Sequence, residues 1–166
     1  MGHADVRMDD REQALLRFAG AAEKLSTLAD GGAGEGGAGE GGPSDAALVR
    51  LQAALCELHA AFLALPEGEE SVHTPPDEAN FARSQQAYER WRRDSPRLAD
   101  ALAGVYRDLI DGLELYRRGS AADREAALWA WQSLYWQHWG EELLKAQQAL
   151  HRLMARQRFD RALAGE

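Results

Sequence analysis

The sequence predicts an all-α protein: an up-and-down bundle of four to five helices that forms one domain over residues 1–166. Apolar residues recur at spacings of three and four in five separate segments, which is the period of an amphipathic helix. We find no convincing alternation of β-branched or aromatic residues with polar ones, the pattern expected of a half-buried strand. The chain is also rich in Ala, Leu, Glu, Arg and Gln, which favour helices, and its 166 residues suffice for one core.

The first helix is expected to start near Asp9–Asp10 and to run to about Ala29. Residues 31–42 follow as GGAGEGGAGEGG, a tandem repeat of Gly-Gly-Ala-Gly-Glu. Such a segment has almost no side chains to bury and a large backbone entropy to lose, so we predict a disordered loop. A phosphate-binding glycine loop is the alternative, but it would need a preceding strand and a following Lys-Ser/Thr pair, and neither is present.

A second helix is predicted between the start signals at Ser44–Asp45 and the stop at Pro66. Its apolar seam keeps a spacing of three and four: Leu48, Leu51, Leu55, Leu58, Phe62 and Leu65. Val49, Cys56 and Leu63 lie seven residues apart and are expected to widen this seam. We therefore interpret Cys56 as a small buried apolar residue rather than a reactive thiol.

A weaker third helix is expected over residues 77–94, with three aromatic residues on one side: Phe81, Tyr88 and Trp91. Ser95–Pro96 then supplies an N-cap and a proline at the first helical position. The fourth helix should run from there to Arg118, because Gly119 is a good C-terminal stop.

Ser120 is predicted to open a fifth helix whose pattern persists to about Ala155, with residues 156–166 as a tail that frays or projects. Gly140 is the weakest point of its interior, and the pattern leaves open whether the helix is continuous past it. On a helical wheel one wide apolar face collects most of the aromatic residues: Leu128, Tyr135, Trp139, Leu143, Ala146, Leu150 and Leu153, flanked by Trp131 on one side and by Trp129, Trp136 and Met154 on the other. We interpret this face as core rather than as a ligand box.

Composition and charge exclude several classes of protein. A net charge of −8 disfavours nucleic acid as a partner, and the basic residues near the C-terminus fit the favoured place of cations at a helix end. No window of 18 uninterrupted apolar residues occurs, so we expect no membrane span. Cys56 is the single cysteine, and the polar start MGHADVRMDDREQ lacks the pattern of a secretory signal. A cytoplasmic location is the resulting expectation.

Catalytic motifs are equally sparse. His-Glu-x-x-His is absent, and the five histidines are scattered, so no nucleophile–base pair suggests itself. His138 and Glu142 lie four residues apart, which lets them share a proton or a ligand on one helix face. A partly buried structural pair is the commoner outcome of this spacing. Enzyme is therefore the disfavoured class, and we expect no cofactor.

The second half of the chain carries blocks that resemble a known family. They are Val105-Tyr-Arg-Asp-Leu109, Gly112-Leu-Glu-Leu-Tyr116, Ala127-Leu-Trp-Ala-Trp131 and His138-Trp-Gly140. In this order they resemble the bacterial domain of unknown function 5063, over about residues 98–153. The resemblance implies an all-helical fold and a bacterial cytosolic protein, and it implies no activity.

If these blocks mark a site, its candidates are the residues that packing alone does not demand: Tyr106, Arg107, Asp108, Tyr116, Trp131, His138 and Glu142. The leading hypothesis is a non-enzymatic interaction or adaptor domain that binds another protein or itself. The alternative is a bundle that binds a small ligand or a metal in a polar pocket around His138 and Glu142. The oligomeric state and the identity of partner or ligand are open at this stage.

Overall fold

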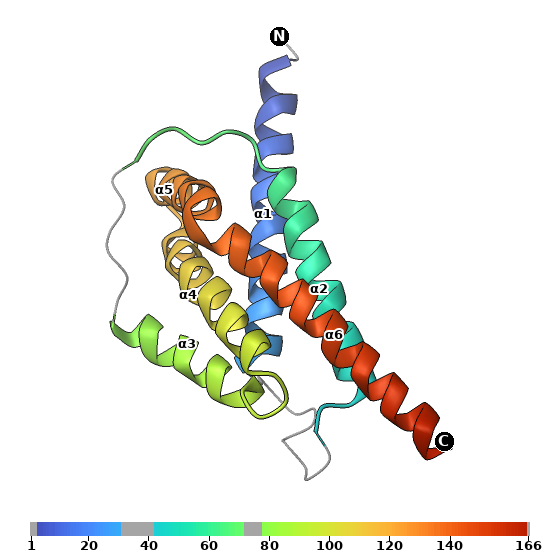
Figure 1. The fold of residues 1–166 in the computed structure, drawn as a ribbon. Helices are drawn as coiled ribbons and strands as arrows, with labels where there is room; N and C mark the ends of the chain where they lie inside the picture. Colours follow the sequence, from blue (N-terminus) through green and yellow to red (C-terminus); the bar gives the residue numbers. More distant parts are fainter. Residues whose placement is uncertain (1–2, 31–41, 72–77, 166) are drawn as a thin grey trace.

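The structure is a computed structural model that describes residues 3–30, 42–71 and 78–165. Within these ranges the chain is all-α and has no strand. Its elements are α1 (His3–Asp30), α2 (Asp45–Leu63), α3 (Glu78–Trp91), α4 (Pro96–Arg118), α5 (Ala121–Leu134), the π-helical turn η1 (Tyr135–Trp139) and α6 (Gly140–Ala164). Because α5, η1 and α6 follow one another without a break, the described residues form five helical segments (Figure 1). The predicted glycine loop lies outside the described residues except for Gly42.

The predicted helix starts are confirmed by side-chain caps. Ser44, Ser95 and Ser120 each lie in extended backbone, and the hydroxyl of each accepts a hydrogen bond from the backbone N–H three residues on. Gly119 ends α4 with a φ of 84°, a left-handed conformation that favours glycine. The first helix differs from its prediction, since α1 already begins at His3.

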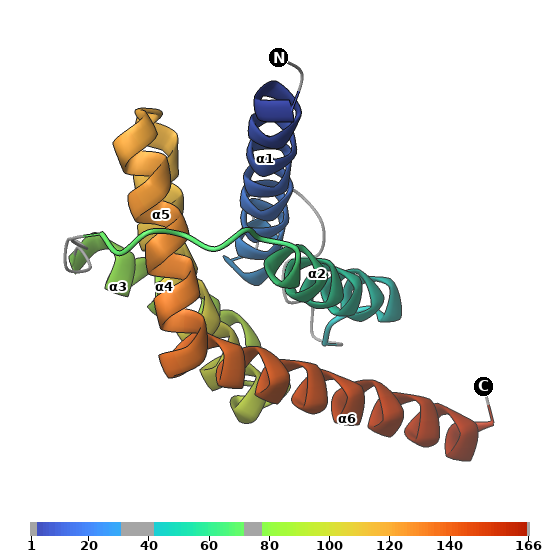
Figure 2. The same cartoon turned by 90° about the horizontal axis from the view of Figure 1, so that it is seen from above.

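α4 is the central helix of the bundle. It contacts α1, α3, α5, α6 and η1, whereas α2 packs between α1 and α6 (Figures 1 and 2). The short connection at Gly119–Ser120 makes α4 and α5 neighbours. α2 therefore lies on the side of the bundle away from α3 and α5, and among the described helices α1 and α6 pack most extensively against it.

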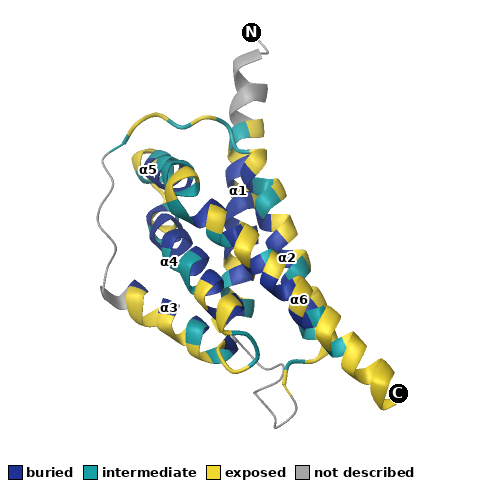
Figure 3. Cartoon of the chain, viewed as in Figure 1, coloured by how far each residue is buried: buried dark blue, intermediate teal, exposed yellow. Residues whose placement is uncertain are grey.

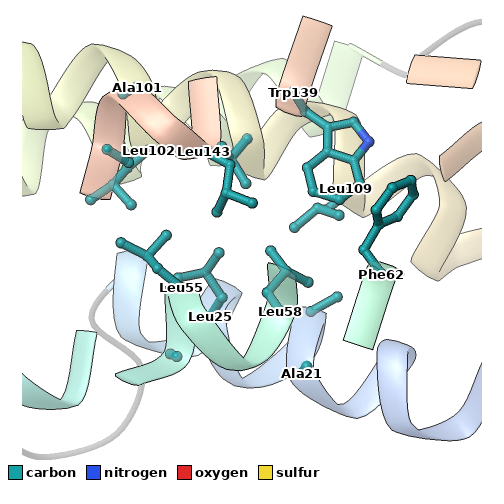
Figure 4. Packing of buried hydrophobic residues seen from close by; sticks show 14 of the residues in the cluster. Ala21, Leu25, Leu55, Leu58, Phe62, Ala101, Leu102, Leu109, Trp139 and Leu143 are labelled. Atoms are coloured by element: carbon teal, nitrogen blue, oxygen red, sulfur yellow. The ribbon is translucent and has the colours of Figure 1, made fainter. Parts of the chain in front are cut away.

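The core is formed where α1, α2, α4 and the α5–α6 segment meet. Leu55 and Leu58 of α2 point toward Leu102 and Leu143 on the opposing helices, and the Phe62 ring lies beside Trp139 (Figure 4). The aromatic rings interlock: the Phe18 and Trp131 rings are 4.7 Å apart, and the Phe62 and Trp139 rings 5.0 Å. Trp131 and Trp139 are fully buried, so the core interpretation of these two residues is confirmed.

The α5–α6 segment is continuous past Gly140 but changes direction at η1 (Figure 2). The Gly140 N–H reaches the Tyr135 carbonyl five residues back, the hydrogen bond that defines a π-helix. A Cβ added at Gly140 would lie 2.6 Å from that carbonyl oxygen. Glycine at this position is therefore what admits the π-turn. Beyond Met154, α6 runs on as an exposed helix to Ala164 (Figure 3).

Several apolar side chains are exposed, and for α2 and Trp136 this contradicts the predicted burial. Val49, Cys56 and Leu63 are exposed, so they do not widen the buried seam of α2 but form a second apolar side. Phe81 of α3 is exposed as well, because α3 turns Ala87 and Trp91 toward the core instead. Trp136, placed beside the core face on the wheel, is exposed because the π-turn alters the register there.

Candidate functional site

The most distinctive polar contact in the described residues joins η1 to α4. His138 Nδ1 lies 2.5 Å from Asp108 Oδ2. The Asp108 side chain is 9% exposed, whereas that of His138 is 38% exposed. An ionised carboxylate only accepts hydrogen bonds, so the imidazole donates from Nδ1. In the neutral ring, Nε2 is then left as the acceptor on the half-exposed side.

Arg107 completes this cluster from the next position on α4. Its Nε donates to Asp108 Oδ1 at 3.3 Å, and its Nη2 lies 3.5 Å from His138 Nε2. Asp108 is therefore held from both oxygens, by a guanidinium and by an imidazole. The arrangement fixes the imidazole ring of His138 and places its Nε2 beside the permanent positive charge of Arg107. A ligand group that both accepts and donates hydrogen bonds would suit this pair.

Glu142 reaches the same place from α6. A Cβ added at Gly104 would lie 3.0 Å from Glu142 Cγ and 3.5 Å from His138 Cε1. The glycine therefore lets α4 approach both side chains closely. The Glu142 carboxylate accepts from Lys145 Nζ at 2.9 Å and does not bind His138, which pairs with Asp108 instead.

A groove of about 340 Å³ continues from Glu142 along α4 and α6. Its charged lining residues are three cations and two acids: Arg97, Lys145, Arg152, Asp100 and Glu142. Among the described residues, no group of three histidine, cysteine, aspartate or glutamate side chains is placed to hold a metal ion. The surroundings of His138 fit an anionic or polar small molecule better than a metal.

The other candidate residues lie elsewhere. Tyr106 is on a different face of α4, where its hydroxyl donates to Asp30 Oδ2 at 3.3 Å. Burial, and secondarily the Asp30 charge, raise the pKa of Tyr106 to about 12. Trp131 is buried, and its indole N–H donates to the Leu109 carbonyl oxygen at 3.1 Å. Tyr116 packs with its ring 6.1 Å from that of Trp131. The structure thus brings together Arg107, Asp108, His138 and Glu142, and leaves Tyr106, Tyr116 and Trp131 in packing positions.

The sequence did not predict a second polar cluster, which lies between α3 and α4. Asn80 is buried, and its Nδ2 donates to Asp111 Oδ1 at 2.6 Å and to Glu114 Oε2 at 3.3 Å. The apolar spacing of α4 did not reveal this cluster, because Asp108 and Asp111 are buried by neighbouring helices that pack on several sides of α4. Acids at such positions need polar partners from a neighbouring helix.

Trp136 is the most exposed large side chain on η1, at 79%. Its ring packs edge-on against Tyr135, 5.0 Å away. Tyr135 is in turn fixed by α2, because its ring stacks on Phe62 at 3.8 Å and its hydroxyl lies 2.9 Å from His59 Nε2. A large exposed aromatic ring therefore sits on a rigid support.

Comparisons with known proteins agree with this fold. Residues 80–156 match the profile of the family described as domain of unknown function (DUF5063), a range that extends the recognised blocks on both sides. The crystal structure of protein BF1032 from Bacteroides fragilis superposes with a TM-score of 0.66 over 83% of this chain and 90% of that chain, at 16% identity. At this identity the likeness concerns the fold alone. No curated protein matches the chain.

Proposed function

Because residues 80–156 form a DUF5063 domain, whose description names no activity, we propose from the geometry that the chain is a helical protein-interaction domain. The observation that carries this proposal is Trp136, which is 79% exposed on the π-turn. A tryptophan ring buries on the order of 150–250 Å² when it is covered, and tryptophan is enriched among the residues that dominate binding energy.

The support beneath Trp136 strengthens the proposal. Tyr135 is held by stacking on Phe62 and by the contact with His59, so the backbone of η1 is anchored to α2. An anchor on a rigid base loses little conformational entropy on binding, which improves affinity. The core does not use the Trp136 ring, so its contribution to folding is small.

A substitution of Trp136 tests this function. Trp136→Ser should leave the free energy of unfolding nearly unchanged and should remove the partner that cross-links to the wild-type chain in cells. Phe81→Ser is the matched control, because Phe81 is another exposed aromatic residue, on α3. A partner that remains with Trp136→Ser, or is lost equally with Phe81→Ser, would contradict the proposal.

A second function has an observation of its own. The ring of His138, fixed by Asp108 beside Arg107 and the groove at Glu142, supports binding of a small anionic or polar molecule. Native mass spectrometry would then show an added mass on the wild-type chain that His138→Ala loses. An added mass that persists in His138→Ala would place the molecule elsewhere.

A further inference from the structure

α2 is apolar on two sides, although only one side faces the core. Among the described helices, α2 alone has the length and the mean hydropathy, 1.4, that would suit a membrane span. Only 33% of this 18-residue apolar stretch is buried. A helix with a second apolar side that its own bundle does not bury has a face left to cover. α2 lies between α1 and α6, and its outer side faces away from the rest of the bundle (Figure 2).

The uncovered side has a strict pattern. Six exposed residues follow the alternating spacing of three and four that marks a heptad seam: Ala46, Val49, Ala53, Cys56, Ala60 and Leu63. This pattern spans the whole helix. Alanine alternates with a larger residue along this seam: Ala46 precedes Val49, Ala53 precedes Cys56, and Ala60 precedes Leu63.

We propose that this seam of α2 binds the same seam of a second copy of the chain, with the two α2 helices antiparallel. In that register Leu63 meets Ala46 of the partner subunit, Val49 meets Ala60 of the partner subunit, and Cys56 meets Ala53 of the partner subunit. Each larger side chain faces an alanine, and twofold symmetry repeats every contact. Small residues let the helix axes approach to the short end of the usual 8–10 Å separation.

The charges beside the seam favour the same register. Arg50 and Glu57 are exposed and lie at equivalent flanking positions, seven residues apart. In the antiparallel pair Arg50 faces Glu57 of the partner subunit, and symmetry gives two such ion pairs. Within one chain Glu57 Oε2 accepts from Lys24 Nζ at 2.5 Å, and this exposed contact leaves the other carboxylate oxygen for the second cation.

A parallel pair lacks both kinds of complementarity. Each larger residue would then meet its own copy, and so would each alanine, which leaves alternating crowded and empty layers. The flanking residue that faces Glu57 of the partner subunit would be Gln52 rather than Arg50. The sequence of the seam therefore selects the antiparallel arrangement.

The surface beside the seam offers room for the partner. A groove of about 540 Å³ runs between α1 and α2, and its lining includes Leu16, Gly20, Ala60 and Ala64. Since Ala60 is the residue that meets Val49 of the partner subunit, this groove receives that side chain. The proposal adds a self-association surface to the interaction function proposed above, and this surface is separate from Trp136.

Sedimentation velocity of the full chain over a range of concentrations tests the proposal by charge exchange. The wild type should dimerise. R50E and E57R each turn two attractive pairs into two repulsive ones and should raise the dimer Kd on the order of tenfold. The double variant R50E/E57R restores opposite charges and should return the Kd to near the wild-type value.

A matched pair of apolar sites controls for general effects of a new charge. Leu63→Glu, at 66% exposure within the seam, should abolish the dimer, whereas Phe81→Glu, at 63% exposure on α3, should not change it. A short bismaleimide should also cross-link two chains through Cys56, the single cysteine of the sequence. In the proposed register the two copies of Cys56 are offset by only about 4.5 Å along the helix axes.

The contradicting results are distinct. A wild-type chain that stays monomeric overturns the proposal, and its co-sedimentation with phosphatidylcholine vesicles would mark α2 as a lipid contact instead. A dimer that the single charge changes leave intact, or that the double change does not restore, overturns the antiparallel seam. These results concern the α2 seam alone; the Trp136 surface is tested separately, by whether Trp136→Ser keeps the cross-linked partner or Phe81→Ser loses it equally.

Discussion

Individual residues fix the interior through close contacts that only glycine permits. The indole of Trp131 lies against α4 so closely that a Cβ added at Gly112 would be 2.1 Å from its Nε1. The same indole is buried and bonded to the Leu109 carbonyl oxygen, so it has no room to move aside. Gly112 and Trp131, both within the recognised blocks, therefore belong to one packing unit.

Gly112→Ala should lower the free energy of unfolding by roughly 1–3 kcal/mol, because the added methyl overpacks a rigid indole. Gly20→Ala is the control, since an added Cβ there meets nothing within 4 Å. It should instead raise the free energy by about 0.5–1 kcal/mol through helix propensity. Urea unfolding of the two variants checks this, and equal effects of both would contradict the packing argument.

Tyr106 predicts how stability depends on alkaline pH. Its pKa is raised to about 12 in the folded chain, against about 10 for an unperturbed tyrosine. The neutral hydroxyl is thus favoured by folding, and its contribution is complete below pH 10 and is lost as the pH rises from 10 toward 12. Urea unfolding at pH 8 to 11.5 should show a smaller alkaline loss for Tyr106→Phe than for the wild type. Parallel losses would mean that Tyr106 does not titrate differently on folding.

At the scale of elements, the sequence predicted what local chemistry determines. Helix starts were predicted at Ser44, Ser95 and Ser120, and a helix end at Gly119. These predictions are confirmed because helix caps depend on neighbouring residues alone. The π-turn was not predicted, since a wheel of constant pitch cannot represent an altered register. That turn exposes Trp136 and moves His138 to Asp108, thirty residues away in the sequence. For the same reason the wheel paired His138 with Glu142.

Gly140→Ala tests the role of the π-turn. Its Cβ would lie 2.6 Å from the Tyr135 carbonyl oxygen, and a backbone atom cannot yield as a flexible side chain does. We expect a loss of roughly 1–3 kcal/mol in the free energy of unfolding. The contact between His138 and Asp108 should weaken too, visible as a change in the imidazole NMR signals. Unchanged stability and unchanged His138 signals would show that η1 does not depend on this glycine.

At the scale of the whole molecule, the fold class followed from periodicity, but the exposed surfaces did not. The wheel for α2 gave a single wide seam, because spacing does not say how many neighbours a helix has. The described neighbours of α2, mainly α1 and α6, cover only part of it, and this leaves Val49, Cys56 and Leu63 exposed. The apolar groups that the bundle does not bury, on α2 and at Trp136, are the physical basis for assigning an interaction function.

Native mass spectrometry of the full chain, purified from cells without a chelator, tests that function most directly. A bare chain of 18.3 kDa is the reference mass. The account predicts twice this mass, or this mass plus another polypeptide. A species that stays at 18.3 kDa at every concentration, or that gains only a small molecule lost with His138→Ala, would contradict the interaction function and favour the site at Asp108 and His138.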